Sequence, residues 1–132
     1  MAHEAKKEGL DIYVDSAGTA NYHEGEEPDE RTTATCKKHD VPIDHLARTV
    51  REEDFTTFDY ILASDIQNLG TLQRMAPEDS PATIALFGSF DDNKSIADPY
   101  YGNISGFENV YNQCTRYSKA FFRSALKRRS VL

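Results

Sequence analysis

One short segment near the end of the chain combines an acid with two aromatic residues: Asp98-Pro99-Tyr100-Tyr101. Proline fixes the backbone beside the acid, which would help to hold a proton donor in place. Two adjacent tyrosines could form the walls of a slot for a flat substrate. The alternative is a surface turn whose aromatic rings fold onto the core, and the pattern alone leaves both interpretations open.

The two cysteines, Cys36 and Cys114, are the candidate nucleophiles by residue type. Neither begins a Cys-x-x-x-x-x-Arg run, because the sixth residue after Cys36 is Pro42 and the sixth after Cys114 is Ala120. Cys36 is followed by two lysines, whose charges could lower its pKa. Cys114 falls on an apolar stripe and is expected in the core. Two cysteines do not form a disulfide framework, which indicates a reducing, cytoplasmic setting.

Histidine is a common metal ligand, and the chain has four: His3, His23, His39 and His45. The run from Cys36 through His39 to His45 fits no standard zinc spacing, and no acidic second cluster accompanies it. We therefore expect neither a metal nor another cofactor.

The charge of the chain argues against a nucleic-acid partner, and its apolar pattern argues against a membrane partner. Its 132 residues carry a formal net charge of −7, which lacks the basic footprint of a nucleic-acid-binding protein. No apolar run approaches the length of a membrane span, and no signal peptide is visible. We expect no nucleic-acid and no membrane partner.

Helical and strand patterns alternate along the chain. The expected elements are a helix over 2–7, a strand over 12–14, a helix from 28–30 to 37–39, a helical turn over 51–54, a strand over 58–63, a helix capped by Asp65 that runs to Met75, and a strand over 83–87.

The last helix has two signals. Ser105-x-x-Glu108 is a capping-box pattern, in which each side chain satisfies a backbone donor of the other residue. Apolar residues then recur at spacings of three and four, as on one face of a helix. They are Phe107, Val110, Tyr111, Cys114, Tyr117, Phe121 and Ala125.

Alternating strands and helices predict a parallel sheet with helices on both faces. In such sheets ligands bind beyond the carboxyl ends of the strands. Asp15-Ser16, Ser64-Asp65 and the loop over 88–102 all follow strands, so their polar groups should gather at one edge.

Taken in order, these segments resemble the low-molecular-weight protein tyrosine phosphatases, and the fungal members most. The resemblance extends from about His3 to Leu126. The segments that carry it are Val14–Thr19, Tyr22–Gly25, Pro28–Arg31, His45–Arg48, Asp54–Phe55, Phe58–Asp65, Leu86–Gly88, Asp98–Gly102 and Phe107–Glu108.

The resemblance implies a three-layer α/β/α sandwich and a phosphomonoesterase. In the family a cysteine thiolate takes the phosphoryl group from a phosphotyrosine protein or a small aryl phosphate, and water then hydrolyses the cysteinyl-phosphate. By resemblance, Asp98 is the general acid. Tyr22, His23, Tyr100 and Tyr101 flank the substrate pocket, and Asp15, Ser16 and His45 support the phosphate loop.

The chain departs from the family pattern at its beginning. The family's first strand and its Cys-x-x-x-x-x-Arg-Ser loop have no counterpart in these residues. We therefore expect 1–132 to be a single, N-terminally truncated domain that lacks the central strand and is inactive alone. Exposed strand edges would favour self-association. The alternative is a non-catalytic form that binds partners of the full-length enzyme or competes with it. The related arsenate reductases also need a nucleophilic cysteine in that loop.

Overall fold

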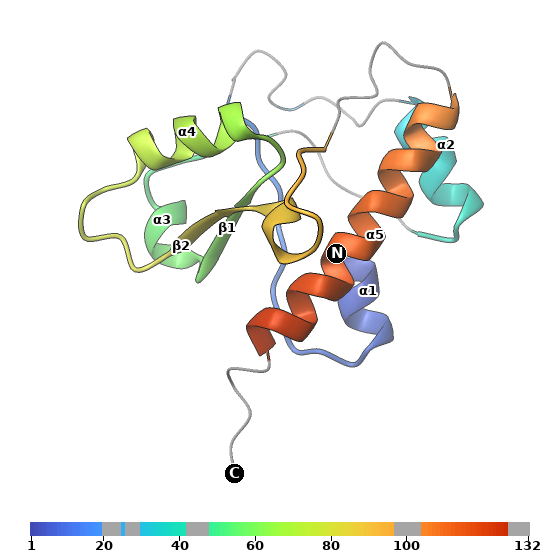
Figure 1. The fold of residues 1–132 in the computed structure, drawn as a ribbon, viewed down its shortest axis with the longest axis horizontal. Helices are drawn as coiled ribbons and strands as arrows, with labels where there is room; N and C mark the ends of the chain where they lie inside the picture. The colour runs from blue at the N-terminus through green and yellow to red at the C-terminus, as the bar shows by residue number, and fades with distance from the viewer. Residues whose placement is uncertain (20–24, 26–29, 42–47, 97–103, 127–132) are drawn as a thin grey trace.

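The computed structural model describes residues 1–19, 25, 30–41, 48–96 and 104–126. From β1 onward strands and helices alternate as the sequence predicts, whereas three helices precede β1 in the described residues (Figure 1). The elements are α1 (Ala2–Lys7), α2 (Glu30–Lys38), α3 (Asp54–Thr57), β1 (Tyr60–Ala63), α4 (Ile66–Met75), β2 (Thr83–Leu86), the 3-10 helix η1 (Phe87–Phe90) and α5 (Ile104–Leu126).

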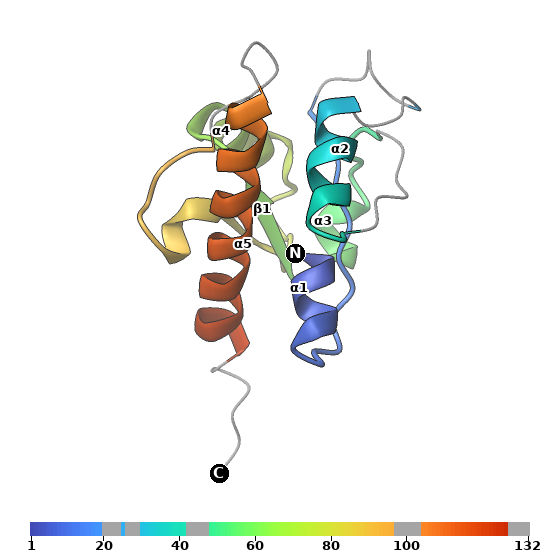
Figure 2. The same ribbon diagram turned by 90° about the vertical axis from the view of Figure 1, so that its right-hand side faces the viewer.

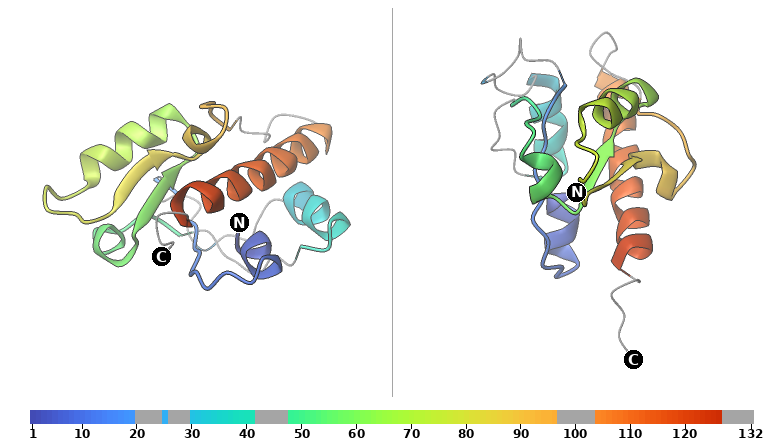
Figure 3. Two further views of the ribbon diagram at one scale, coloured as in Figure 1. Left: turned by 60° about the horizontal axis from the view of Figure 1, so that its bottom comes forward. Right: turned by 90° about the vertical axis from the view of Figure 1, so that its left-hand side faces the viewer.

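The sheet is built from β1 and β2, which pair in parallel. Tyr60 lies opposite Thr83 and Ala63 lies opposite Leu86. Helix α4 makes the crossover between the two strands, which is the usual connection of a parallel pair. Helices α3 and α4 lie on one side of the sheet, and α1, α2 and α5 lie on the other (Figures 1 and 3). The predicted parallel sheet with helices on both faces is confirmed.

Alternate residues of β1 supply the two cores, because successive side chains of a strand point to opposite faces. Tyr60 and Leu62 pack against the buried residues of α1 and α5. Ile61 packs in the other cluster, which includes the buried Ala63. The Tyr60 ring meets the Phe121 ring edge-on, with 5.1 Å between centroids. Both faces of the strand are therefore covered by helices.

The predicted strand over 12–14 is wrong. The only pairing in this part of the described chain is an isolated parallel bridge between Gly18 and Thr49. The Gly18 N–H donates to the Arg48 carbonyl at 2.8 Å, and the Val50 N–H donates to the Gly18 carbonyl at 2.9 Å. A strand needs a ladder of such bonds, and within the described residues β1 pairs only with β2.

Side chains, rather than backbone hydrogen bonds, hold the segment 12–14 beside β1. Ile12 packs against the same α1–α5 cluster as Tyr60. Tyr13 stacks on Phe58 with 5.9 Å between ring centroids, although Tyr13 is 77% exposed. The segment and β1 thus have not closed up into a ladder, and among the described residues the second edge of β1 has no strand partner.

Helix α5 begins differently from the prediction. Its first residue is Ile104, so Ser105 lies inside the first turn and not at the N-cap position. The Glu108 carboxylate contacts His39 and Lys38 at the end of α2 (the α2–α5 pair is clearest in Figure 2). The predicted capping box is therefore wrong, because a charged partner on another helix engages the acid.

Other boundaries agree with the sequence to within a few residues. Asp65 caps α4 as predicted, and its side chain accepts a hydrogen bond from the Asn68 N–H. The turn expected over 51–54 is α3, which starts at Asp54. Strand β2 ends at Leu86 because the chain turns at once into η1. On the apolar stripe of α5, Tyr117 is fully buried and Phe107, Phe121 and Ala125 are buried. Phe122, which the stripe did not include, is buried as well.

Candidate active site

Most residues that the sequence assigns to the site lie outside the described residues. Their roles stay predictions, and they are Asp98, Tyr22, His23, Tyr100, Tyr101 and His45. Asp15 and Ser16 are described, as are both flanks of the Asp98 segment. The structure therefore shows the scaffold that the predicted acid would stand on.

Polar groups from separate loops meet at the carboxyl end of the sheet. Thr19 Oγ1 donates to Asn68 Oδ1 at 3.1 Å, and Asn68 Nδ2 donates to Ser64 Oγ at 3.1 Å. The Ile96 N–H donates to the Ser64 carbonyl at 2.8 Å. These bonds join the Thr19 loop, the β1–α4 loop and the segment that leads to Asp98. The predicted meeting of the β1–α4 loop with the segment that leads to Asp98 is therefore confirmed, whereas in these contacts the first loop joins them through Thr19 and not through Asp15 or Ser16. Asn68 is a connector that the sequence did not reveal.

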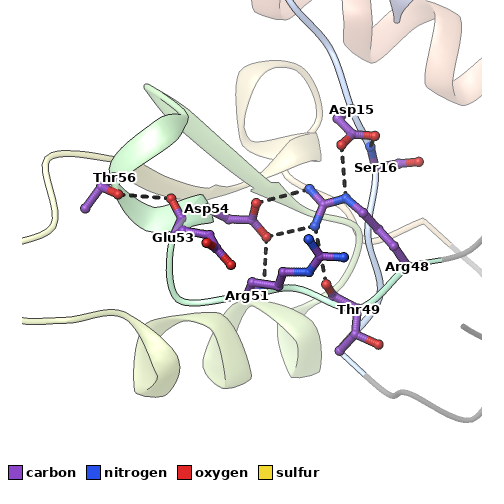
Figure 4. Close-up of polar contacts among 8 residues, drawn as sticks. All are labelled: Asp15, Ser16, Arg48, Thr49, Arg51, Glu53, Asp54 and Thr56. Atoms are coloured by element: carbon purple, nitrogen blue, oxygen red, sulfur yellow. Dashed lines mark hydrogen bonds and ion pairs between the residues drawn. The ribbon is translucent and has the colours of Figure 1, made fainter.

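Asp15 shapes the first of these loops. One carboxylate oxygen accepts the Ser16 N–H at 2.8 Å, and the other accepts Arg48 Nε at 3.0 Å (Figure 4). Aspartate side chains often accept hydrogen bonds from neighbouring backbone N–H groups in loops. Asp15 therefore bonds within its own loop and ties that loop to Arg48.

Arg48 is the hub of this region (Figure 4). Its Nη1 and Nη2 atoms donate to the two carboxylate oxygens of Asp54, at 3.0 and 3.1 Å. Nη1 also donates to the Thr49 carbonyl at 3.3 Å. Planar guanidinium and carboxylate groups match in such bidentate pairs. One side chain therefore joins the Asp15 loop to the start of α3. Arg48 belongs to the segment His45–Arg48 that carries the family resemblance, but the sequence alone assigned it no role.

The partners in this hub shift the pKa values of Asp54 and Arg48. Burial would raise the pKa of the Asp54 carboxyl, but hydrogen bonds from Arg48 and the Arg51 N–H hold it below its usual range. The hydrogen bond to Asp54 raises the pKa of the Arg48 guanidinium against an opposing effect of burial. All three side chains, Asp15 included, are less than a quarter exposed. The cluster is thus an ion network shielded in part from water.

The far flank of the predicted acid segment is held by α2. The Glu108 carboxylate contacts His39 Nε2, and the His39 ring stacks on Tyr111 with 4.0 Å between centroids. The Arg31 guanidinium lies 4.6 Å from the centre of the Phe107 ring, in the range of a cation–π contact. Residues on both sides of Asp98 therefore have firm partners.

Neither cysteine has the environment of a nucleophile. Both are free and half-buried. Burial raises the pKa of the Cys36 thiol, and the positive amino group of Met1 offsets this only in part. Burial likewise raises the pKa of Cys114. The expectation that the neighbouring lysines lower the pKa of Cys36 is wrong, because desolvation dominates.

The described ranges contain neither a metal site nor a membrane-spanning helix. Among those residues, no group of three or more histidine, cysteine or acidic side chains could hold a metal ion. His23 and His45 fall outside these ranges. No described helix is long and apolar enough to cross a membrane.

The chain is similar along nearly all of its length to one family of known proteins. A family model described as low molecular weight phosphotyrosine protein phosphatase matches residues 1–131. The chain belongs to this family. The phosphatase of this family from Saccharomyces cerevisiae is 39% identical over 132 residues, which cover 94% of this chain and 82% of the relative. The human phosphatase is 47% identical over 116 residues, which cover 85% of this chain and 73% of the relative. Sequence identity therefore does not place the chain nearer to this fungal relative than to the human one.

Comparison with solved structures supports the same assignment. The crystal structure of Primo-1 superposes with a TM-score of 0.90 at 36% identity, and covers 95% of this chain and 85% of that chain. The structure named drosophila arginine phosphatase superposes with a TM-score of 0.86 at 35% identity, over 92% and 83% of the two chains. The fold of this family member is therefore the low molecular weight phosphatase fold.

Proposed function

We propose that residues 1–132 form one domain that carries the substrate-recognition and proton-donor side of a phosphatase for phosphotyrosine or small aryl phosphates, without the nucleophile. The match to the family model over residues 1–131 carries this proposal. Asp98 donates the proton to the leaving oxygen. Tyr22, His23, Tyr100 and Tyr101 flank the aryl ring, and Asp15, Ser16 and His45 support the phosphate loop. A cytoplasmic location is proposed with it, since both cysteines are free.

The scaffold around the Asp98 segment supports the proton-donor role. A general acid must be held within hydrogen-bond reach of the atom that it protonates. Ile96 is bonded to the Ser64 carbonyl on one side of the segment, and Glu108 contacts His39 on the other. Described residues on both sides of Asp98 are therefore attached to the body of the domain.

The sequence supports the second half of the proposal. No cysteine among the 132 residues begins the Cys-x-x-x-x-x-Arg pattern that supplies the family's nucleophile and arginine clamp. Burial raises the pKa of both Cys36 and Cys114, so each is a weak substitute at neutral pH.

Magnitudes decide what these residues can do alone. Enzymes accelerate the hydrolysis of phosphate monoesters by up to about 10²¹. General acid catalysis contributes only about 10² to 10⁴. Most of the remainder comes from positioning and from donors around the transferring group, which the Cys-x-x-x-x-x-Arg loop supplies in the family. Asp98 by itself leaves nearly the whole barrier standing.

Hydrolysis of an aryl phosphate and of a phosphotyrosine peptide tests the proposal. At about pH 5 to 6, where a carboxylic acid is still partly protonated, the purified chain is expected to release no phosphate above background. A phosphoarginine peptide belongs in the same assay, because one structural relative is named an arginine phosphatase. Asp98→Asn and Cys36→Ser run beside it. Turnover that Asp98→Asn abolishes would overturn the proposed lack of a nucleophile.

We also propose that copies of the chain associate through the edge of β1 that has no strand partner among the described residues. Unpaired strand edges recruit strands of other chains. Sedimentation velocity should show a coefficient that rises with concentration. Tyr13→Lys places a charge beside this edge and should weaken association, whereas Ile66→Lys, at a similarly exposed position that opens α4, should not. A chain that stays monomeric at every concentration would contradict the proposal.

A further inference from the structure

A tight turn over Asp91–Ser95 connects η1 to the segment that leads to Asp98. The Asp91 and Asn93 N–H groups both donate to the Gly88 carbonyl, at 3.0 and 2.7 Å. Asn93 has a φ of 62°, in the left-handed region that asparagine tolerates. The Asp92 carboxylate accepts the Lys94 N–H at 3.1 Å. The turn is therefore closed by its own hydrogen bonds.

Helix α5 grips this turn with three side chains. Tyr117 donates its hydroxyl proton to Asp92 Oδ1 at 2.5 Å. Arg116 donates to Asp91 and Asp92, both at 2.8 Å. Gln113 Nε2 donates to the Tyr117 hydroxyl at 2.9 Å and lies 3.3 Å from the Ser95 carbonyl. Consecutive residues of the turn are thus attached to one helix.

The hydrogen bond from Tyr117 to Asp92 is the strongest of these contacts. The Tyr117 side chain is fully buried, and its ring packs edge-on against Phe87 at 5.4 Å. A hydroxyl that donates to a carboxylate forms one of the stronger hydrogen bonds in proteins. The Arg116 side chain is 53% exposed, and ion pairs at such positions contribute little. Loss of the Tyr117 hydroxyl would therefore release the turn more than loss of Arg116.

The position of the turn suggests its purpose. Ser95 is followed by Ile96, whose N–H is bonded to Ser64, and Asp98 comes two residues later. We infer that Tyr117 is a positioning residue for Asp98, which acts by holding Asp92 and so fixing the path of the backbone into the acid segment. This inference rests on the proposed function, in which Asp98 is the proton donor.

Two variants separate positioning from packing. Tyr117→Phe keeps the ring against Phe87 and removes only the hydroxyl. Tyr60→Phe is the matched control, because the Tyr60 ring is also packed on an aromatic residue but its hydroxyl has no hydrogen-bond partner among the described residues. Asp92→Asn keeps a side-chain oxygen that can accept the Tyr117 hydroxyl proton. We therefore expect this variant to hold the turn in part.

The readouts are amide hydrogen exchange and the Asp98 carboxyl resonance of the full chain labelled with carboxyl-¹³C aspartate. Exchange at the Ile96 amide should rise about tenfold in Tyr117→Phe, since the variant loses a hydrogen bond to a charged group that holds the turn. The Asp98 resonance, identified by its loss in Asp98→Asn, should move in Tyr117→Phe and stay in place in Tyr60→Phe. Asp92→Asn should give a smaller shift of the same kind.

Two results would overturn the inference: an unmoved Asp98 resonance in Tyr117→Phe, or a rise in exchange that is equal throughout α4, β1 and the turn. Each of these two results would overturn the inference regardless of the outcome of the hydrolysis assay. Failure of the proposed function is seen separately, as turnover of the unmodified chain that Asp98→Asn leaves unchanged. The two failures are therefore distinguishable.

Discussion

Arg48→Ala is expected to destabilise the domain by about 3 kcal/mol, the low end for breaking a buried ion pair, because the partners retain some exposure. The change removes both bonds to Asp54 and the bond to Asp15. Two partly buried carboxylates then face each other without their shared cation. Urea unfolding at neutral pH measures the loss. Arg74→Ala, which removes an exposed guanidinium bonded only to Thr71 in the described chain, should change stability by no more than about 0.5 kcal/mol.

The pH dependence of this difference tests its cause. The folded-state pKa of Asp54 is lowered, so its contribution is fully present above the unfolded value of 3.8 and is lost as the pH falls through the folded value. The gap between the native chain and Arg48→Ala should therefore be widest at neutral pH and narrow below about pH 4. A gap that is the same at pH 3 and pH 7 would show that Arg48 stabilises through packing alone.

Gly88→Ala is expected to destabilise the domain by about 3 kcal/mol, as severe overpacking does. Gly88 is buried, and a Cβ there would lie 2.0 Å from the Lys94 carbonyl oxygen and 3.0 Å from the Lys94 nitrogen. These are backbone atoms, so the turn itself must move. Because the turn precedes the Asp98 segment, exchange at the Ile96 amide should rise as well.

Gly70→Ala is the matched control with the opposite sign. Gly70 lies in α4, and among the described residues its Cβ would meet only the Arg74 Nη1 atom, at 3.3 Å, at the end of a flexible side chain. Alanine is favoured over glycine in a helix by up to about 1 kcal/mol. Thermal unfolding should therefore rank Gly70→Ala above the native chain and Gly88→Ala far below it. Equal melting temperatures for the two variants would contradict the reported close approach.

Local signals in the sequence were sufficient for most of the fold. Asp65 follows a strand and precedes a helical pattern, and a side chain of this type caps helices without tertiary help. The spacing of Tyr117 and Phe121 gave the buried face of α5 because helical geometry alone sets it. The alternation of strands and helices likewise predicted the parallel sheet.

Other features depend on partners that local patterns do not reveal. The segment 12–14 has the composition of a strand, but strand formation requires a paired neighbour. Glu108 suits a capping box, but it contacts His39, which is distant in sequence. The hub residue Arg48 and the connector Asn68 act across loops, so only their tertiary contacts identify them. The roles of Asp98, Tyr100 and Tyr101 stay predictions, since these residues lie outside the described ranges.

The most direct test of the account is a search for a phosphorylated cysteine. The chain is incubated with an aryl phosphate and quenched in acid, and its intact mass is measured by mass spectrometry. The variants Cys36→Ser and Cys114→Ser are treated in the same way. The account predicts no increase in mass, because residues 1–132 contain no Cys-x-x-x-x-x-Arg loop and burial raises the pKa of both thiols. An adduct of one phosphoryl group that disappears in one of the two variants would identify a working nucleophile and contradict the proposal that the chain lacks one.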